Sequence, residues 1–325
     1  MFRALVIGCG KIAGGDAFFG PTTHGGAYAV RQGIQLAAGI DTDPERARGF
    51  ASRFGCEYGS ELIPALKHYA PDVVSVCTPD ETHFDVVCEI LCAARVPRVI
   101  FLEKPACSTK EQYVSMEQLA AERGSTIVVN HSRRFDLDIQ NLRERIAAGE
   151  FGRLERVRAV YYSGWLHNGT HIVDTLAFLL NDTIQVDSIL GVIESPYLHD
   201  PTPEVQATLR KLNAPVLISA IDENLYQLFE FDFWFEGARL RLEDFGERVI
   251  LEHRVVNEIG ERVLEMRPNG LPERLKVPME EAVSRIESYL ASSDPTVLAG
   301  CRLEDIGPTM ETLWQGQRLY EQSES

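Results

Sequence analysis

Two positions in the sequence carry side chains suited to acid–base chemistry. Lys104 lies between a glutamate and a proline, directly after the apolar run Val99–Leu102. His171 lies near the start of a helix-like stretch, and Asp174 follows it one turn later. A lysine ammonium can polarise an oxygen, and imidazole titrates near neutral pH, so both suit proton transfer from a hydroxyl group. A surface lysine and a structural histidine are the alternative interpretations.

A glycine-rich turn follows the first apolar run, Ala4 to Ile7. It reads Gly8-Cys9-Gly10-Lys11-Ile12-Ala13, which is a G-x-G-x-x-A pattern. The first glycine permits a tight turn, the second lets the backbone approach a pyrophosphate, and the small third residue lets a helix pack on the strand. The pattern predicts a dinucleotide site that includes Gly8, Gly10, Lys11, Ile12 and Ala13.

Asp41 comes directly after the second apolar run, Ile34–Ile40. A carboxylate at this point can accept hydrogen bonds from both ribose hydroxyls and would repel a 2′-phosphate, which favours NAD as the cofactor. Asp41 comes later than the usual spacing of about 20 residues. We attribute the delay to an inserted loop at Gly14–Thr23. The alternative is that Asp41 is only a turn residue ahead of Asp43-Pro44.

The order of apolar and amphipathic stretches indicates two domains. Up to about residue 130, five short apolar runs alternate with helix-length stretches, which predicts a parallel sheet covered on both faces. Further along, Gln227–Phe235 alternates with a period of two, as in an antiparallel sheet with one face on a core. We therefore expect an α/β fold with an NAD-binding Rossmann domain at residues 1–130. A substrate-binding and oligomerisation α+β domain with a mostly antiparallel sheet should follow at residues 131–325.

Polar residues follow three neighbouring apolar runs of the first domain. Thr78-Pro79, Glu103-Lys104-Pro105 and Asn130 come directly after the third, fourth and fifth of these five runs. Ligands of open parallel sheets bind outside the carboxyl ends of the strands, so these residues should line one crevice. Arg134 could add a contact to an anionic substrate group, with a structural ion pair as the alternative.

Charge and cysteine usage narrow the class of protein. The formal net charge is −16, and a surface that acidic repels nucleic acid and anionic lipid. The seven cysteines include no C-x-x-C pair, which is typical of a reducing compartment. We interpret Cys88 and Cys92 as small core residues on one helix face. With no signal peptide and no apolar run of about 20 residues, we expect a cytoplasmic protein.

Taken in order, these motifs resemble those of the glucose–fructose oxidoreductase, inositol dehydrogenase and MocA family (Gfo/Idh/MocA) over nearly the whole chain. The resemblance is carried by Gly8–Ala13, Asp41–Ala47, Cys77-Thr78-Pro79, Thr82-His83, Glu103-Lys104-Pro105, Asn130, Arg134-Phe135 and Gly169–Asp174. It implies that Lys104 contacts a substrate hydroxyl and that Glu103 and Pro105 set the backbone beside the nicotinamide. It also adds Thr78, Pro79, His83 and Asn130 to the expected cofactor site.

The resemblance further implies substrate contacts from Arg134, His167, Asn168, His171 and Asp174. The sequence departs from the family in one of them. Family dehydrogenases commonly carry an aspartate four residues before the histidine, and here that residue is His167. The spacing of His167, His171 and Asp174 is compatible with a metal, but the family needs none and we expect none.

The leading hypothesis is an NAD-dependent dehydrogenase or reductase that acts on a CH–OH group of a sugar, nucleotide sugar or cyclic polyol. One alternative is an NAD-dependent glycosidase or epimerase that uses transient oxidation. Another is a nucleotide-sensing regulator, although a sensor would need neither Lys104 nor His171. We also expect a homodimer or homotetramer formed through the open face of the second sheet, where Tyr226, Leu228 and Trp234 lie among charges.

Overall fold

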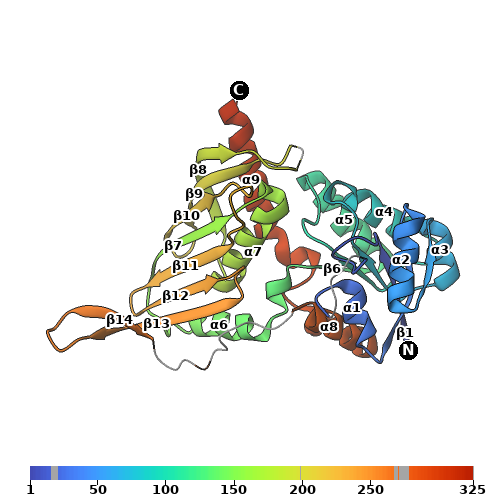
Figure 1. The fold of residues 1–325 in the computed structure, drawn as a ribbon, viewed down its shortest axis with the longest axis horizontal. Coiled ribbons are helices and arrows are strands. Elements are labelled where there is room, and N and C mark those ends of the chain that lie inside the picture. The colour runs from blue at the N-terminus through green and yellow to red at the C-terminus, as the bar shows by residue number, and fades with distance from the viewer. Residues whose placement is uncertain (16–20, 198, 267–269, 271–277, 325) are drawn as a thin grey trace. The chain divides into compact units, whose positions relative to one another are not determined.

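The computed structural model describes residues 1–15, 21–197, 199–266, 270 and 278–324. The expected insertion Gly14–Thr23 therefore falls in part on residues outside the described ones. The chain divides into two compact units, which are described separately (Figure 1). Unit 1 consists of Met1–Phe135 and Val277–Gly307, and unit 2 of Asp136–Lys276 and Pro308–Ser325. No helix in the described part of the chain is long and apolar enough to span a membrane.

Unit 1 is built on a six-stranded parallel sheet in the order β3-β2-β1-β4-β5-β6. All four residues of β4 and of β5 are buried, which requires cover on both faces of the sheet. This is the strand order of a Rossmann fold, so the predicted fold class is confirmed for this unit. The strands are β1 (Phe2–Ile7), β2 (Ile34–Ile40), β3 (Glu57–Gly59), β4 (Val73–Val76), β5 (Val99–Leu102) and β6 (Thr126–Val129).

The helices of unit 1 begin and end at recognisable capping residues. The side chain of Asp43 accepts the backbone N–H of Glu45, and Pro44 occupies the first turn of α2. Thr109 and Gln112 form a capping box at the start of α5. The helices in this part of the chain are α1 (His24–Ala29), α2 (Pro44–Phe54), α3 (Leu62–Tyr69), α4 (His83–Cys92) and α5 (Lys110–Arg123). Cys92 is exposed at the end of α4, so its expected place in the core is wrong.

The division between the units corrects the expected boundary at residue 130. Helix α8 (Pro278–Ser292) belongs to unit 1, although it comes late in the chain. Its residues Met279, Val283 and Ile286 lie in the same hydrophobic cluster as Tyr28 and Phe135. Burial of this apolar side stabilises the packing of α8 in unit 1. Two short 3-10 helices, η4 (Pro295–Leu298) and η5 (Leu303–Ile306), follow α8 in the chain.

Unit 2 contains an eight-stranded, mostly antiparallel sheet in the order β14-β13-β12-β11-β7-β10-β9-β8, in which only β10 and β7 pair in parallel. Helices α6 (Leu137–Ala147), α7 (Gly169–Leu180) and α9 (Gly307–Glu324) lie along one face of it (Figure 1). The strands are β7 (Leu154–Tyr161), β8 (Ile184–Ile193), β9 (Thr202–Leu209), β10 (Pro215–Ala220), β11 (Glu230–Phe235), β12 (Ala238–Glu243), β13 (Arg248–Val256) and β14 (Arg262–Met266).

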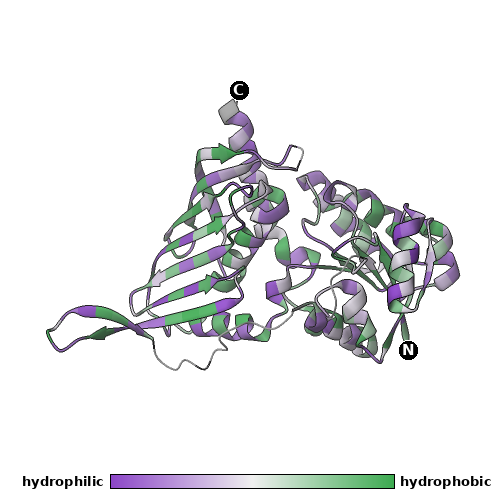
Figure 2. Cartoon of the chain, viewed as in Figure 1, coloured by the Kyte–Doolittle hydropathy of each residue, from purple (hydrophilic) through white to green (hydrophobic). Residues whose placement is uncertain are grey.

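Alternation along β11 follows the predicted parity. Phe231 and Phe233 are buried, whereas Asp232 and Trp234 are partly exposed, and Figure 2 shows this alternation across the neighbouring strands. The strand starts at Glu230, three residues later than expected. Residues 226–229 lie outside the ladder, after a turn at 223–225 in which Asp222 accepts the backbone N–H of Asn224.

Candidate functional site

The first glycine of the turn after β1 is required by the fold itself. Gly8 has a φ of +84°, in the left-handed region that favours glycine. A Cβ atom there would lie 2.6 Å from the carbonyl oxygen of Cys77, which is a backbone atom that cannot move aside easily. Gly8 therefore lets β1 turn tightly beside the end of β4.

The second glycine has no such explanation among the described residues. A Cβ atom built on Gly10 would meet none of their atoms within 4 Å, and its φ is not left-handed. Lys11 and Ile12 are exposed beside it, while Ala13 is fully buried and its carbonyl accepts the backbone N–H of Gly25. The turn thus presents an open stretch of backbone at Gly10, and the small residue at 13 lets α1 approach.

Asp41 is held in place by two backbone amides. Its Oδ2 accepts the N–H of Cys9 at 2.7 Å, and its Oδ1 accepts the N–H of Asp43 at 2.8 Å. The contact with Asp43 is the turn role that was the alternative interpretation of Asp41. Asp41 has this role and also contacts the glycine turn through Cys9. Each oxygen keeps a further lone pair for a ribose hydroxyl. Burial and the charge of Asp41 raise the pKa of the Cys9 thiol to about 12, so the thiol stays protonated.

The residues that follow β4, β5 and β6 gather at the carboxyl edge of the sheet. Thr78 and Lys104 are half-buried, Pro79 is exposed and Asn130 is buried, with 4% of its surface exposed. Within the described part of the chain, Oγ1 of Thr78 and Oδ1 of Asn130 are buried and make no hydrogen bond. Buried polar atoms normally have partners, so these two indicate contacts that a ligand would complete.

Glu103 belongs to a buried polar network. Its Oε1 accepts the amide of Asn130 at 2.6 Å and lies 2.8 Å from Nε2 of His24, whose Nδ1 lies 2.9 Å from the hydroxyl oxygen of Ser75. Burial raises the pKa of Glu103, but the hydrogen bond and charge of His24, together with Asn130 and Lys104, outweigh it, so the net pKa is lowered. The ionised form of this carboxyl group is therefore favoured.

His83 and Arg134 are both directed to backbone oxygens. The ring of His83 is fully buried, with Nδ1 2.7 Å from the carbonyl oxygen of Pro105 and Nε2 3.0 Å from that of Thr78. Arg134 is also buried, and its Nη1 donates to the carbonyl of Gly300 at 2.6 Å. These contacts favour structural roles for two residues that were expected to bind ligands directly.

In unit 2 the predicted residues lie on α7 and in the turn before it. His171 is half-buried and meets the ring of Phe229 edge-on at 6.1 Å between centroids. Asp174 is 2% exposed, and its Oδ1 accepts the hydroxyl of Thr309 at 2.9 Å. Asp174 is thus fixed to α9 one helical turn from His171.

The turn before α7 is a π-helical segment, η3 (Gly164–Asn168), that is held by Asp200. The carboxylate accepts the backbone N–H groups of Leu166 and His167, each at 2.8 Å. Burial raises the pKa of Asp200, although these N–H groups partly offset the shift. The ring of His167 stacks on Tyr197 at 3.8 Å between centroids, and the side chain of Asn168 bonds to the Tyr162 hydroxyl.

Comparison with known families identifies the first part of the chain. Residues 2–131 match the family model described as an oxidoreductase family with an NAD-binding Rossmann fold, Gfo/Idh/MocA. These residues belong to the Gfo/Idh/MocA family. The family resemblance drawn from the motifs is confirmed for this region, which contains the glycine turn, Asp41 and Lys104.

The chain is also similar to individual family members. It is 29% identical over 153 residues to the D-glucoside 3-dehydrogenase of Escherichia coli K12, covering 47% of this chain and 41% of that protein. It is 29% identical over 156 residues to an inositol 2-dehydrogenase of Rhizobium meliloti 1021, covering 48% and 43%. The matches therefore span less than half the length of these curated relatives.

A solved structure extends the likeness in fold to both units. The UDP-N-acetylglucosamine 3-dehydrogenase of Acidithiobacillus ferrooxidans superposes with a TM-score of 0.72 at 20% identity, over 98% of this chain and 97% of that one. At this identity the likeness establishes the fold alone. It confirms the predicted combination of a Rossmann domain with a second α+β domain on a mostly antiparallel sheet.

The residues of the Gfo/Idh/MocA region fit the NAD(P) cofactor that the family implies. The open backbone at Gly10 and the unsatisfied Oδ1 of Asn130 are features that the described residues do not explain. No group of three or more His, Cys, Asp or Glu side chains in the described residues could hold a metal ion.

Sequence reasoning missed His24, Tyr197, Asp200 and Thr309. Each comes from a segment without a motif and meets its partner only in the folded chain. His24 contacts Ser75 and Glu103. Tyr197 and Asp200 contact the turn before α7, and Thr309 contacts Asp174. The one available signal was the position of His24 at the start of a helix, directly after Thr23, which caps it.

Proposed function

We propose that the protein is an NAD-dependent oxidoreductase that transfers hydride to or from a hydroxyl or carbonyl carbon of a sugar, nucleotide sugar or cyclic polyol. The observation that carries this proposal is Gly10, where the fold leaves room for a side chain and the sequence provides none. A bare backbone beside the amide-held carboxylate of Asp41 suits a dinucleotide. The half-buried Lys104 after β5 then supplies a cation at the same edge of the sheet.

The cofactor roles follow from the residues of unit 1. The turn at Gly8–Ala13 would hold the pyrophosphate, and Asp41 would accept the ribose hydroxyls. The Oδ1 of Asn130 offers a buried acceptor at the other end of the edge. When bound, the nicotinamide would accept or return the hydride. Because the Asp41 charge would repel a 2′-phosphate in this partly dry site, we propose NAD rather than NADP.

Two side chains are proposed for the chemistry. The Lys104 ammonium would donate a hydrogen bond to the reacting oxygen and stabilise the negative charge that develops there. His171 would accept the hydroxyl proton on oxidation and return it on reduction. Asp174 lies one turn along α7 from His171, a spacing at which helical side chains meet, and could orient the ring. His167 and Asn168 are proposed substrate contacts.

The proposed substrate class draws on the relatives. Two of them are named as dehydrogenases of a glucoside and of inositol, and a structure of the same fold as a dehydrogenase of a nucleotide sugar. All three substrates carry several hydroxyl groups on a ring. A site with hydrogen-bonding groups such as His167 and Asn168 suits such compounds better than apolar ones.

A substrate screen with two variants tests this function. Sugars, polyols and nucleotide sugars are offered with NAD while NADH absorbance is followed, and Lys104→Ala and His171→Ala are then compared with the wild type. Each variant should lose about 10²–10⁴-fold in rate, because positioned acid–base groups contribute on that scale, while NAD affinity measured by calorimetry stays unchanged. His167→Asp should shift the pH optimum or substrate range but keep turnover.

Three outcomes would contradict the assignment. Near-full activity of Lys104→Ala on an identified substrate would refute the mechanism. Substrate turnover without net NADH would support the transient-oxidation glycosidase or epimerase instead. If no compound reacts while both alanine variants remain folded and bind NAD, the regulator hypothesis gains support.

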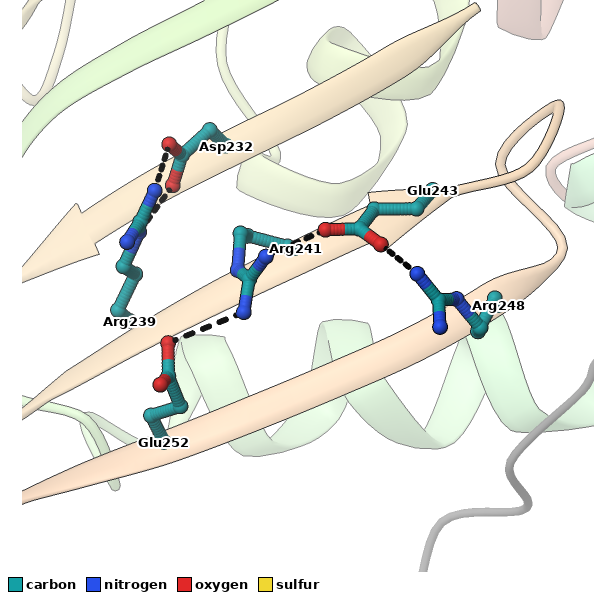
Figure 3. Close-up of polar contacts among 6 residues, drawn as sticks. All are labelled: Asp232, Arg239, Arg241, Glu243, Arg248 and Glu252. Atoms are coloured by element: carbon teal, nitrogen blue, oxygen red, sulfur yellow. Dashed lines mark hydrogen bonds and ion pairs between the residues drawn. The ribbon is translucent and has the colours of Figure 1, made fainter. Parts of the chain in front are cut away.

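We also propose a homodimer or homotetramer that associates through the face of the unit 2 sheet opposite α6, α7 and α9. This face carries a network of three arginines and three carboxylates. Its ion pairs are Asp232–Arg239, Arg241–Glu243, Arg241–Glu252 and Arg248–Glu243 (Figure 3). Two copies of a chain with net charge −16 repel each other least where positive and negative side chains balance.

A further inference from the structure

The neighbours of Lys104 are more deeply buried than Lys104 itself. Glu103 and Pro105 are both buried, whereas Lys104 is half-buried between them. Each neighbour contacts a fully buried histidine, and the two histidines come from different helices. His24 is the first residue of α1, and His83 is the first residue of α4.

On the amino side, His24 holds the side chain of Glu103. Its Nε2 lies 2.8 Å from Oε1 of Glu103, a distance at which the ring N–H donates to the carboxylate. Its Nδ1 lies 2.9 Å from Oγ of Ser75, which in turn lies 2.9 Å from the hydroxyl of Tyr28. The ring is also packed against Phe101, with 4.6 Å between the centroids. His24 therefore has one orientation in which both nitrogens are used.

On the carboxyl side, His83 holds the backbone of Pro105. Its Nδ1 lies 2.7 Å from the Pro105 carbonyl oxygen, the shorter of its two contacts with carbonyl oxygens, so we place the N–H of the neutral ring on Nδ1, from where it donates to Pro105. Its Nε2 lies 3.0 Å from the carbonyl oxygen of Thr78, in the segment after β4. The ring thus bridges the segments that follow β4 and β5.

Burying two imidazoles and a carboxylate costs more than burying apolar side chains of the same volume. What the polar contacts add is a fixed direction for the residues on each side of Lys104. A displacement of about 1 Å in a reacting group can cost about 10²-fold in rate, so such fixing has a functional consequence.

We infer that His24 and His83 are positioning residues that hold the backbone and charge environment of Lys104. The inference rests on the proposed role of that lysine. His24 acts through the Glu103 carboxylate, whose ionised form is favoured by both His24 and Lys104. His83 acts through the Pro105 carbonyl.

Paired amide variants test each histidine at the level of a single nitrogen. The amide nitrogen of asparagine occupies a place similar to Nδ1, and that of glutamine a place similar to Nε2. His83→Asn should keep the Pro105 contact and most of the kcat, whereas His83→Gln should lose kcat by about 10- to 100-fold. For His24 the order reverses, because Gln keeps the Glu103 contact and Asn keeps only Ser75. NAD affinity should change little in all four.

Tyr28→Phe is the control for loss of a buried hydrogen bond as such. It removes the hydroxyl that contacts Ser75 and should lower thermal stability without lowering kcat. A double-mutant cycle tests whether His83 acts through Lys104. In a Lys104→Ala background, His83→Gln should cause no further loss of activity. Equal losses of kcat in the Asn and Gln variants, or the same loss with and without Lys104, would overturn the inference.

A readout that needs no turnover separates this inference from the proposed function. The chain has six lysines, so carbon-13 methyl groups placed on the amines by reductive methylation give few NMR signals, and Lys104→Arg identifies the one from Lys104. That signal should move in His83→Gln and His24→Asn but not in Tyr28→Phe. If it moves while Lys104→Ala keeps its activity, the positioning is right and the proposed catalytic role is wrong. If it does not move, the positioning is wrong.

Discussion

Two glycines in one turn should respond oppositely to the same substitution. Gly8→Ala would force a left-handed residue and bring its Cβ to 2.6 Å from a backbone carbonyl, so we expect a loss of stability of at least about 1–2 kcal/mol. The new methyl group of Gly10→Ala meets no atom of the described residues within 4 Å, and the residue has no left-handed φ, so the substitution should leave the fold intact. It should even stabilise the free protein by about 0.4–1 kcal/mol, because alanine lowers the conformational entropy of the unfolded chain.

The effect of Gly10→Ala should appear when the cofactor is added. A methyl group forced into a packed contact typically costs about 1–3 kcal/mol, and a cost of about 2 kcal/mol weakens binding about 30-fold. At an NAD concentration of about 100 times the wild-type Kd, binding stabilises the wild type by about 2.7 kcal/mol. The same concentration would stabilise Gly10→Ala by only about 0.9 kcal/mol.

Thermal unfolding without NAD measures the stability of the free protein, and the shift in Tm on addition of NAD measures the stabilisation by binding. At about 2–4 °C per kcal/mol, the wild type should gain about 5–10 °C on addition of NAD and Gly10→Ala about 2–3 °C, from an equal or higher starting Tm. Gly8→Ala should start several degrees lower. If Gly10→Ala keeps the full NAD-induced shift, or if it unfolds earlier than the wild type without NAD, the argument that a ligand explains this glycine is refuted.

Three further predictions concern the cofactor, the cysteines and the oligomer. Asp41→Ala should weaken NAD binding and narrow the gap to NADP in calorimetry, and tighter binding of NADP by the wild type would contradict the NAD assignment. Iodoacetamide at pH 8 should label the exposed Cys92, as read by mass spectrometry, and spare Cys9 and Cys107, because burial raises the pKa of each thiol to about 12. Light scattering should give a mass above the 36.4 kDa monomer, and Arg241→Glu should reduce it, whereas a wild-type monomer at micromolar concentration would rule out the proposed assembly.

The Rossmann elements could be predicted from the sequence because their signals are local. Helices α2 (Pro44–Phe54) and α5 (Lys110–Arg123) are two of the helix-length stretches that alternate with the apolar runs. Each begins at a capping side chain and ends at a left-handed glycine, Gly55 or Gly124, so both ends are encoded within a few residues. The glycine turn and Asp41 likewise depend only on neighbouring strands.

Contacts between distant segments could not be predicted in this way. Nothing in the α8 sequence tells that its apolar side packs beside Tyr28 rather than in the second domain. The same holds for Asp200, which holds the backbone N–H of His167 from 33 residues away. His83 fits the motif, but only the fold reveals that its ring faces two backbone carbonyls.

Three features of unit 1 that contacts among the described residues do not explain restrict the size of the proposed ligand. These are the bare backbone of Gly10 after β1 and the unsatisfied oxygens of Thr78 after β4 and Asn130 after β6. With Asp41 after β2, the set extends over the strand order β2-β1-β4-β5-β6. Four steps between neighbouring strands amount to about 19 Å. One sugar or one nucleoside could not reach from Asp41 to Asn130, whereas an extended molecule with two nucleotide halves could, and this favours a dinucleotide over a single nucleotide as the cofactor.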